Sequence, residues 1–360
     1  MIRVEKELFG IFKDFEVYKY KIKNDNGFQV NAINYGGTIT EIYVKDKNGK
    51  LKNVVLGYKS LEKYIESNAY PGMIIGRTAG RIENSKFEID GITYKLDKNN
   101  GENNIHGGFV GFNNKVFNVE IFESGVEFNY ESPHLEGGYP GNIKIKIKYT
   151  LTNDNSLVIE YEGISDKKTY INLANHSYFN LSGNLDENGD EQVLTIKSDN
   201  ICELKEGIIP TGKLLKVKDE ENSIFDFVKG KKIKEGIEKG QSEGNYQFKI
   251  TRAYDHPFKL NWSEIKNEPQ IILKSLYSGI KMDVFTTEKI AVLYTGNFLD
   301  EVEVFDNENN KRNQNKRYLG IAIETQDYPN GVNIRDFDSK ILEKGEKYYS
   351  KTIFKFSNFQ

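Results

Sequence analysis

The chain has 360 residues, a net charge of -3 at pH 7, and 12% aromatic residues, with 22 Tyr and 22 Phe. This length can bury a large core without disulfides or metals, and the many aromatic residues favour strands. The balanced charge argues against a nucleic-acid partner, and no run approaches the about 18 consecutive apolar residues of a membrane-spanning helix. A single cysteine, Cys202, and an N-terminus unlike a signal peptide predict a cytoplasmic protein.

In the first half of the chain, the pattern predicts short strands joined by hairpins. Turn dipeptides at Asn48-Gly49, Asp90-Gly91 and Ser124-Gly125 each separate two runs of alternating apolar and polar residues. Further along, three isoleucines alternate with three lysines between residues 143 and 148. Such alternation is typical of an antiparallel strand with one face on the core and the other in water.

Helical signals are few. We expect one helix at residues 60–70, with Ser60 as its N-cap, and a second around residues 223–237. Strands joined by hairpins instead of crossover helices predict an all-β fold, a large antiparallel β-sandwich with a few short helices. No linker or repeat divides the chain, so we expect residues 1–360 to form one domain. The polar stretch 306–316 is expected to be a solvated loop.

The stretch NLANHSYFNLSG, residues 172–183, places polar groups within an apolar strand pattern. On an extended chain, alternate side chains share a face. One face then carries Tyr170, Asn172, Ala174, His176, Tyr178 and Asn180, and the other carries Ile171, Leu173, Phe179 and Leu181. His176 either lines a cleft or is hydrogen-bonded inside the sandwich core, and the sequence alone leaves both open.

A second strand pattern, residues 319–326, places Glu324 on the same face as two very small residues, Gly320 and Ala322. Small neighbours leave room for a ligand beside the carboxylate. Partial desolvation would raise the carboxyl pKa from about 4.3 towards neutrality, which suits a general base. The alternative is a strand-end carboxylate in a surface ion pair.

Other candidate residues lie in loops and at strand ends. His106 is flanked by glycines that let the backbone approach a ligand closely. Arg77 and Arg81 are four residues apart, so we expect them to share a face. Asp255 and His256 are adjacent on a predicted strand, so at most one of them reaches a given site.

Several enzyme classes lack their signature residues. The four histidines, His106, His134, His176 and His256, show no metal-ligand spacing, so no metal site is expected. No G-x-S-x-G nucleophile elbow is present. A glycosidase needs two facing carboxylates, for which Asp255 and Glu324 are the candidate pair. The remaining groups suit acid/base chemistry on a polyhydroxylated ligand.

Nearly end to end, the sequence resembles the aldose 1-epimerases, also called galactose mutarotases. The resemblance rests on motifs in a fixed order, each weak by itself: NYGGTI, GRTAGRI, NIHGG followed by GF, GYPGN, NLANHSYFNLSG, IIPTG, YDHPF, YTGNFLD and ETQDYPNGVN.

The resemblance implies a galactose mutarotase-like supersandwich that needs no cofactor or metal. It implies interconversion of the α and β anomers of a free hexose, such as galactose or glucose, by ring opening and reclosure. His176 would protonate the ring oxygen, and Glu324 would be the base at the anomeric hydroxyl. Arg81, His106 and Asp255 would bind the monosaccharide. The protein would be a monomer or a homodimer, with no nucleic-acid or membrane partner.

Three positions depart from the family pattern. Gly80 stands where an Asn is frequent, Val292 where a polar residue such as Gln is frequent, and Phe117 where a Trp is common. The first two bear on sugar preference. Three rival functions stay open at this point: an epimerase of a phosphorylated hexose, a non-catalytic carbohydrate-binding protein, and a glycosidase.

Overall fold

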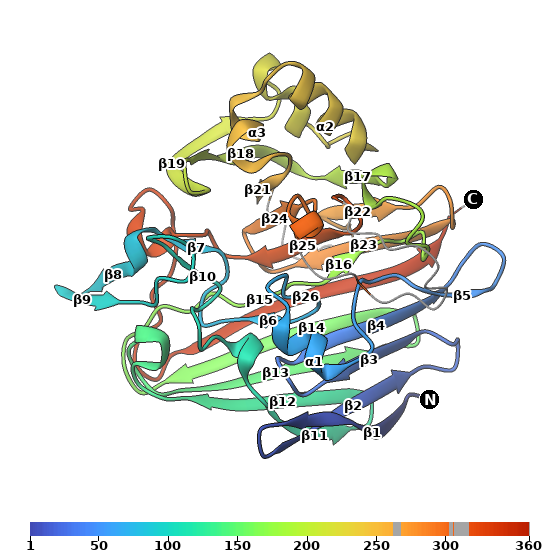
Figure 1. Cartoon of the computed structure of the whole chain (residues 1–360), viewed down its shortest axis with the longest axis horizontal. Helices are drawn as coiled ribbons and strands as arrows, with labels where there is room; N and C mark the ends of the chain where they lie inside the picture. Colours follow the sequence, from blue (N-terminus) through green and yellow to red (C-terminus); the bar gives the residue numbers. More distant parts are fainter. Residues whose placement is uncertain (262–267, 302–304, 306–316, 360) are drawn as a thin grey trace.

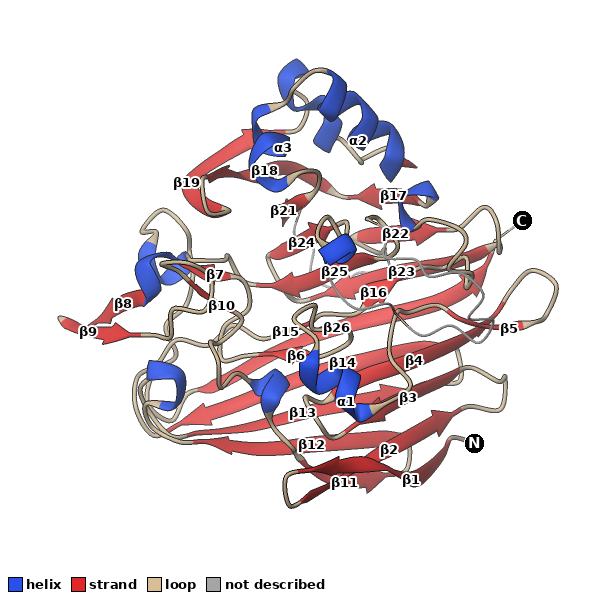
Figure 2. Ribbon diagram, in the orientation of Figure 1, coloured by secondary structure: helices blue, strands red, loops and turns tan. Residues whose placement is uncertain are grey.

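The computed structural model describes residues 1–261, 268–301, 305 and 317–359 (Figure 1). The polar stretch 306–316 lies outside the described residues. Strands dominate the structure, and the few helices are short (Figure 2). Within the described ranges, none of the helices has the length and apolar character needed to cross a membrane.

The largest sheet of the described chain has nine strands. It runs, in spatial order, through β11 (Asn118–Phe122), β12 (Gly125–Ser132), β13 (Ile143–Leu151), β14 (Ser156–Ser165), β26 (Lys347–Asn358), β23 (Ile280–Thr286), β22 (Ile271–Lys274), β17 (Val193–Ile196) and β20 (Lys231–Lys232). The last long strand of the chain, β26, therefore inserts between β14 and β23 and joins the two halves of this sheet.

Two further large sheets complete the architecture. The five-stranded sheet runs through β1 (Arg3–Phe12), β2 (Phe15–Lys23), β3 (Gln29–Ile33), β4 (Thr38–Lys45) and β5 (Leu51–Asn53). The six-stranded sheet runs through β16 (Tyr178–Phe179), β25 (Ile321–Gln326), β24 (Ile290–Tyr294), β21 (Asp255–Leu260), β18 (Ser198–Lys205) and β19 (Ile209–Lys216).

Three two-stranded pairs and the short helices fill the ends of the sheets. The pairs are β6 (Ile74–Ile75) with β15 (Ala174–Asn175), β7 (Arg81–Ile82) with β10 (Asn104–Ile105), and β8 (Lys86–Ile89) with β9 (Ile92–Lys95). The α-helices of the described residues are α1 (Leu61–Glu66), α2 (Ile233–Ser242) and α3 (Tyr246–Thr251). The 3-10 helices are η1 (Glu83–Ser85), η2 (Phe112–Asn114), η3 (Glu136–Gly138), η4 (Gly189–Glu191), η5 (Glu220–Phe225), η6 (Leu299–Glu301) and η7 (Gly331–Asn333).

One apolar core unites the three large sheets. It takes side chains from the five-stranded sheet, such as Val30, from the nine-stranded sheet, such as Ile145, and from the six-stranded sheet, such as Ile323. On β13 the isoleucines are buried while the lysines point outward, as predicted. Every pairing between the labelled strands is antiparallel, so the predicted all-β antiparallel fold is confirmed.

The three predicted hairpins are present, joining β4 to β5, β8 to β9 and β11 to β12. The helix predicted at residues 60–70 forms, but only over α1. The second predicted helix is wrong in its bounds, because η5 and the short strand β20 occupy much of residues 223–237 and α2 begins only at Ile233.

Candidate active site

A cleft of about 180 Å³ opens where the six-stranded sheet meets the loops around residues 68–81 and 104–108. All five residues that the sequence singles out for the site line it. Its described lining residues are Asn68, Ala69, Tyr70, Gly80, Arg81, Ile105, His106, His176, Tyr178, Leu204, Ile208, Pro210, Asp255, Pro257, Val292, Tyr294, Phe298, Leu299, Glu324, Gln326 and Pro329.

Strand β25 places Glu324 in this cleft by simple alternation. Ile321 and Ile323 pack into the core, while Glu324 and Gln326 line the cleft. On the neighbouring strand, Val292 lies directly opposite Glu324 in the sheet register. The predicted alternation is therefore confirmed for Ile321, Ile323 and Glu324. The expectation that the small residues leave room for a ligand is wrong, because Ala322 packs in an apolar cluster and a Cβ at Gly320 would lie 2.6 Å from Leu56.

His176 lies between β15 and β16, and its backbone is fixed on both sides. Its N–H donates to the Met73 carbonyl at 2.9 Å, and its own carbonyl accepts from the Gly72 N–H at 3.0 Å. Leu173 and Phe179 pack into the core on the other side of this segment. Of the two predicted environments of His176, the structure shows the cleft.

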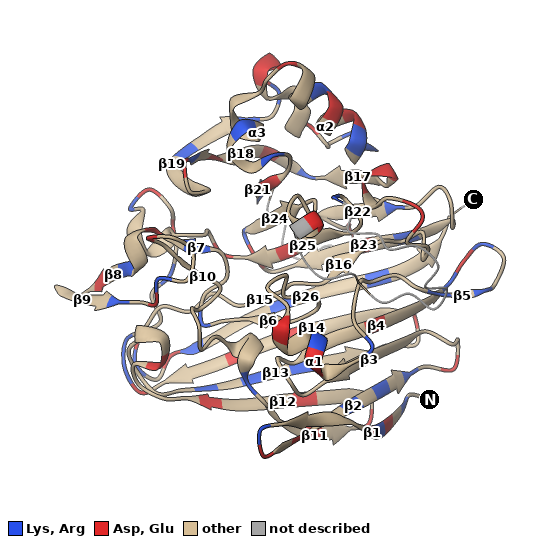
Figure 3. Ribbon diagram, viewed as in Figure 1, with Lys and Arg blue, Asp and Glu red and all other residues tan. Residues whose placement is uncertain are grey.

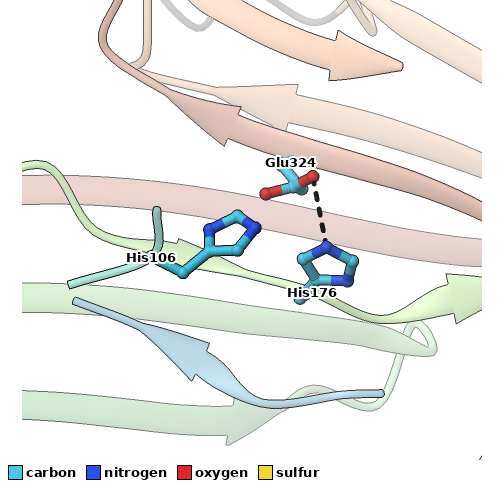
Figure 4. A group of neighbouring side chains, drawn as sticks. All are labelled: His106, His176 and Glu324. Atoms are coloured by element: carbon cyan, nitrogen blue, oxygen red, sulfur yellow. Dashed lines mark ion pairs between the residues drawn. The ribbon is translucent and has the colours of Figure 1, made fainter. Parts of the chain in front are cut away.

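The imidazole of His176 and the carboxylate of Glu324 face each other across the cleft (Figure 4). Nε2 of His176 lies 3.6 Å from Oε1 of Glu324, and both side chains are only 5% exposed. Oε2 of Glu324 and Nδ1 of His176 are buried, and neither has a hydrogen-bond partner among the described residues. Two titratable residues far apart in the chain thus meet in one cleft.

Burial sets the charge state of this pair when no sugar is bound. Desolvation, assisted by the nearby Asp255 carboxylate and opposed by Arg81, raises the pKa of Glu324 to about 8. Desolvation lowers the pKa of His176 to about 4. The rise at Glu324 agrees with the sequence-based expectation. Between these two values the pair holds one proton, which resides on Glu324 when no sugar is bound.

Arg81 and Asp255 form a second pair in the cleft. Nη1 of Arg81 lies 3.7 Å from Oδ2 of Asp255, and Nε of Arg81 donates to Oδ1 of Asn100 at 3.1 Å. Burial raises the pKa of Asp255, and Arg81 opposes that rise. His256 does not line the cleft. It packs against Phe225, with ring centroids 4.7 Å apart, as expected for a neighbour on the opposite face.

His106 stands beside His176, with ring centroids 5.4 Å apart, and also contacts Tyr70 at 4.9 Å. The backbone N–H of Gly80 donates to Nδ1 of His106 at 3.4 Å. A neutral imidazole whose Nδ1 accepts carries its proton on Nε2. Burial, together with the charges of His176 and Arg81, lowers the pKa of His106 well below its usual value. His106 therefore presents an N–H donor to the cleft.

The same tautomer bears on metal binding. Ligand atoms of His106, His176 and Glu324 lie within 4.8 Å of one another, which a cation could bridge (Figure 4). However, metal ligation by Nε2 of His106 would require the proton to move to Nδ1, which already accepts from Gly80. The arrangement therefore suits a hydroxylated ligand better than a metal ion.

Arg77 corrects one prediction. It does not share the face of Arg81, because the chain between them turns through Gly80 at φ 72°. Instead it is buried and donates to the carbonyls of Ser132, Pro133, Pro140 and Gly141, which fixes the 132–141 loop.

Sequence reasoning missed several cleft residues. Tyr70, Tyr294 and Gln326 line the cleft alongside the predicted groups. Gln326 shares the alternating face of Glu324, so the strand pattern could have identified it. Tyr70 adopts φ 55° in an irregular loop, and no periodic pattern could have placed it.

Comparisons with known proteins agree with this geometry. A family model described as aldose 1-epimerase matches residues 18–355. The chain is 34% identical to galactose mutarotase of Bos taurus, with 99% of each chain covered. It is also 34% identical to aldose 1-epimerase of Haemophilus influenzae, with 93% of this chain and 94% of that protein covered.

Solved structures show the same fold. A galactose 1-epimerase from Lactobacillus acidophilus superposes with a TM-score of 0.83 at 27% identity, covering 100% of both chains. An aldose epimerase homologue from C. elegans also gives a TM-score of 0.83 at 27% identity, covering 94% of this chain and 98% of that one. Fold, cleft and relatives agree, and the chain belongs to the aldose 1-epimerase family of carbohydrate isomerases.

Proposed function

We propose that this protein interconverts the α and β anomers of a free aldose, with His176 and Glu324 as its acid/base pair. One observation carries the proposal: two titratable groups of opposite type meet at 3.6 Å in a buried cleft. Groups whose pKa values are pushed apart by burial at one site are typical of acid/base catalysis.

The reaction needs one base and one acid at neighbouring oxygens. Glu324, as a carboxylate, takes the proton of the anomeric hydroxyl, while protonated His176 gives a proton to the ring oxygen. The bond between the anomeric carbon and the ring oxygen breaks, and an open-chain aldehyde forms. Rotation about the adjacent carbon–carbon bond presents the other face of the aldehyde. The two groups then exchange roles: His176 takes its proton back from the freed hydroxyl, whose oxygen attacks the aldehyde carbon, and Glu324 returns its proton to the carbonyl oxygen, which closes the opposite anomer.

The pair has the proton that this cycle requires. Without a bound sugar that proton lies on Glu324, since burial favours both neutral forms. A bound sugar changes the balance, because its anomeric hydroxyl donates to the carboxylate and its ring oxygen accepts from the imidazolium. Hydrogen bonds to a charged form favour that form. Substrate binding thus moves the proton to His176 without exchange with solvent.

Arg81, His106 and Asp255 provide the contacts that orient the sugar. A guanidinium and the Nε2–H of His106 donate to hydroxyl oxygens, and the Asp255 carboxylate accepts from hydroxyl hydrogens. Tyr178 and Phe298, which both line the cleft, offer aromatic surface to the apolar face of the ring. Fixed positions for both partners lower the entropic cost of reaction.

The charge of the cleft disfavours a phosphorylated hexose. Among the described lining residues, Arg81 is the only Lys or Arg, and it already faces Asp255. A phosphate group would need further cations to offset its charge. The carboxylate of Asp255 is likewise engaged with Arg81, which argues against its use as the second carboxylate of a glycosidase.

Polarimetry tests the proposal directly. The protein should speed the decay of optical rotation of freshly dissolved α-galactose or α-glucose, and glucose 6-phosphate should decay at the spontaneous rate. Binding of sugar without acceleration would instead indicate a carbohydrate-binding protein, and release of reducing sugar from a disaccharide a glycosidase. The cytoplasmic location and the monomeric or dimeric state stay predictions from sequence.

A further inference from the structure

Gln326 is a buried amide at the base of the cleft to which the mechanism above gives no role. It lies two residues beyond Glu324 on β25, so both side chains are on the cleft face of the sheet. The residue is 0% exposed. Its amide must therefore find its hydrogen-bond partners in the protein or in a ligand.

Asn172 fixes which end of this amide faces the cleft. Oδ1 of Asn172 accepts from the backbone N–H of Asp327 at 2.8 Å, so its other terminal atom must be the Nδ2 donor. That Nδ2 donates to the Asp327 carbonyl at 3.1 Å and to Oε1 of Gln326 at 3.4 Å. Gln326 consequently presents its oxygen to Asn172 and its Nε2 away from it.

Asn172 is held in this orientation by the backbone of Asp327, which pairs with both ends of its amide, and its main chain is fixed as well. Its backbone N–H donates to the Arg77 carbonyl at 2.9 Å, and its carbonyl accepts from the Ala79 N–H at 2.7 Å. The orientation of the Gln326 amide is thus set by backbone groups through Asn172, and a flipped amide would bring two NH₂ groups together.

Nε2 of Gln326 has no partner among the described residues. A buried amide donor without an acceptor is unfavourable, and such groups are uncommon in folded proteins unless a ligand or water completes them. Two further buried polar atoms at the cleft also have no partner among the described residues, Oε2 of Glu324 and Nδ1 of His176. Gln326 adds an oriented donor beside them.

We propose that Nε2 of Gln326 donates a hydrogen bond to a hydroxyl oxygen of the bound sugar, which makes Gln326 a substrate-binding residue. This inference rests on the proposed function, since it takes the ligand to be an aldose. In the sheet register, Asp255 is aligned with Tyr294 and Ala322, two residues before Glu324 on β25. Gln326 lies two residues after Glu324, on the opposite side of it. The donor of Gln326 therefore contacts a part of the sugar ring distinct from the part near Asp255.

The test uses Gln326→Met, which keeps the length of the side chain and removes the donor. Loss of one neutral hydrogen bond should raise KM for galactose about three- to tenfold, with kcat nearly unchanged, because the contact is made equally in the ground and transition states. The melting temperature should fall only slightly, because the one hydrogen bond lost within the described protein is the 3.4 Å contact from Nδ2 of Asn172, which also donates to the Asp327 carbonyl. Gln326→Leu, which also removes the donor and adds no titratable group, should raise KM as well.

Gln192→Met is the matched control. The Gln192 amide is buried and fully used, since Nε2 donates to the carbonyls of Phe179 and Gly189 and Oε1 accepts from the Leu181 N–H. This variant should lose thermal stability and keep its KM. Gln326 would have a merely structural role if its variants behaved in the same way.

Deoxy sugars give a readout that does not depend on stability. In a series of monodeoxygalactoses, one member should lack the hydroxyl that Gln326 contacts, and for it wild type and Gln326→Met should have equal KM. The inference is overturned if the wild type is active and the variants keep the wild-type KM. It is also overturned if the ratio of the Gln326→Met KM to the wild-type KM is the same for every sugar in the series. A wild type that does not accelerate mutarotation overturns the proposed function instead.

Discussion

At the cleft, the protonation of two side chains controls the proposed chemistry. The pKa of His176 is lowered to about 4 and that of Glu324 is raised to about 8, in both cases chiefly by burial. Because the groups are 3.6 Å apart, they titrate as a pair that carries one proton between these values.

The pH dependence of activity follows from the number of protons that the pair of His176 and Glu324 carries. Below about pH 4 the pair gains a second proton and has no base, and above about pH 8 it loses its last proton and has no acid. We expect kcat/KM to be flat between these limits and to fall on both sides. Polarimetry from pH 3 to 10, corrected for the spontaneous rate, measures it. A profile without a fall on one side would contradict the one-proton requirement.

Asp255 should act in binding. Asp255→Asn removes the charge that faces Arg81 and weakens the acceptor offered to the sugar, so we expect KM to rise about tenfold or more while kcat changes less. Asp338→Asn is the control, because this exposed carboxylate pairs with Lys289 outside the cleft. An unchanged KM for the Asp255 variant would remove it from the binding site.

How well the site residues could be predicted depends on their local backbone. His176 and Glu324 lie on extended segments, where alternation alone separates the cleft face from the core face. The same rule separated Asp255 from His256. Arg77 was misplaced because the periodic rule does not apply to a segment that turns through a glycine at positive φ.

At the scale of elements, the loop that carries His106 depends on close backbone packing. Gly107 has φ 83°, and a Cβ at this position would lie 1.9 Å from the carbonyl oxygen of Gly76. No side chain can move aside to relieve this contact, because the obstacle is backbone. The position of His106 in the cleft therefore requires glycine next to it.

Gly107→Ala should destabilise the protein and impair activity together. Gly91→Ala is the matched control, with φ 77° and no atom within 4 Å of its Cβ, and should cost only the about 1–2 kcal/mol of a left-handed alanine. We expect Gly107→Ala to lower the free energy of unfolding, measured in urea, by more than Gly91→Ala does. It should also raise KM, because His106 is displaced. Equal losses of stability in the two variants, with unchanged KM, would show that the loop tolerates the added methyl.

Among the elements, strands and hairpins were more predictable than helices, of which α1 was expected whereas the bounds of α2 and the presence of α3 were not. The hairpins follow from local turn residues that accept positive φ, such as Asp90 and Gly91. Helix α3 has only six residues, too few to show a periodic pattern, and is capped by Asn245, whose side chain accepts from two backbone N–H groups. The bounds of α2 were missed because Ile224 and Phe225, which the expected helix included, lie in the separate 3-10 helix η5.

At the scale of the whole molecule, the spatial order of strands lies beyond local patterns. Strand β26 pairs with both β14 and β23, which lie far from it in the chain. The fold class could be inferred from the sequence, whereas these long-range pairings could not, because nothing within a strand specifies its neighbours. Charges of both signs are interspersed along the strands (Figure 3), in keeping with the small net charge.

Buried histidines should make the fold sensitive to acid. Burial lowers the pKa of His256 to about 3, and that of His176 to about 4, below the ordinary value of 6.5. At these histidines the unfolded chain therefore binds more protons than the folded one below pH 6.5, and the stability that they contribute above that pH is lost as the pH falls towards 3, whereas the raised pKa of Glu324 acts in the opposite sense. His256→Phe keeps the packing on Phe225 and removes one of these groups.

Thermal unfolding from pH 7 to pH 4 measures this effect. The melting temperature of His256→Phe, taken relative to that of the wild type, should rise as the pH falls from 7 to 4, because the variant lacks one group that the fold must keep neutral. His134→Gln, a change at an exposed imidazole in the 132–141 loop, should follow the wild type. Parallel curves for the His256 variant and the wild type would show that His256 does not contribute to acid sensitivity.

The shared role of His176 and Glu324 is tested most directly by polarimetry on Glu324→Gln and His176→Asn beside the wild type. Each positioned proton transfer contributes about a hundred- to ten-thousand-fold, so each variant should lose at least about a hundredfold in kcat. Thr325→Val, on the opposite face of β25 with its hydroxyl paired to Thr352, should keep the wild-type rate. Folded Glu324→Gln or His176→Asn protein with a rate close to that of the wild type would contradict the account.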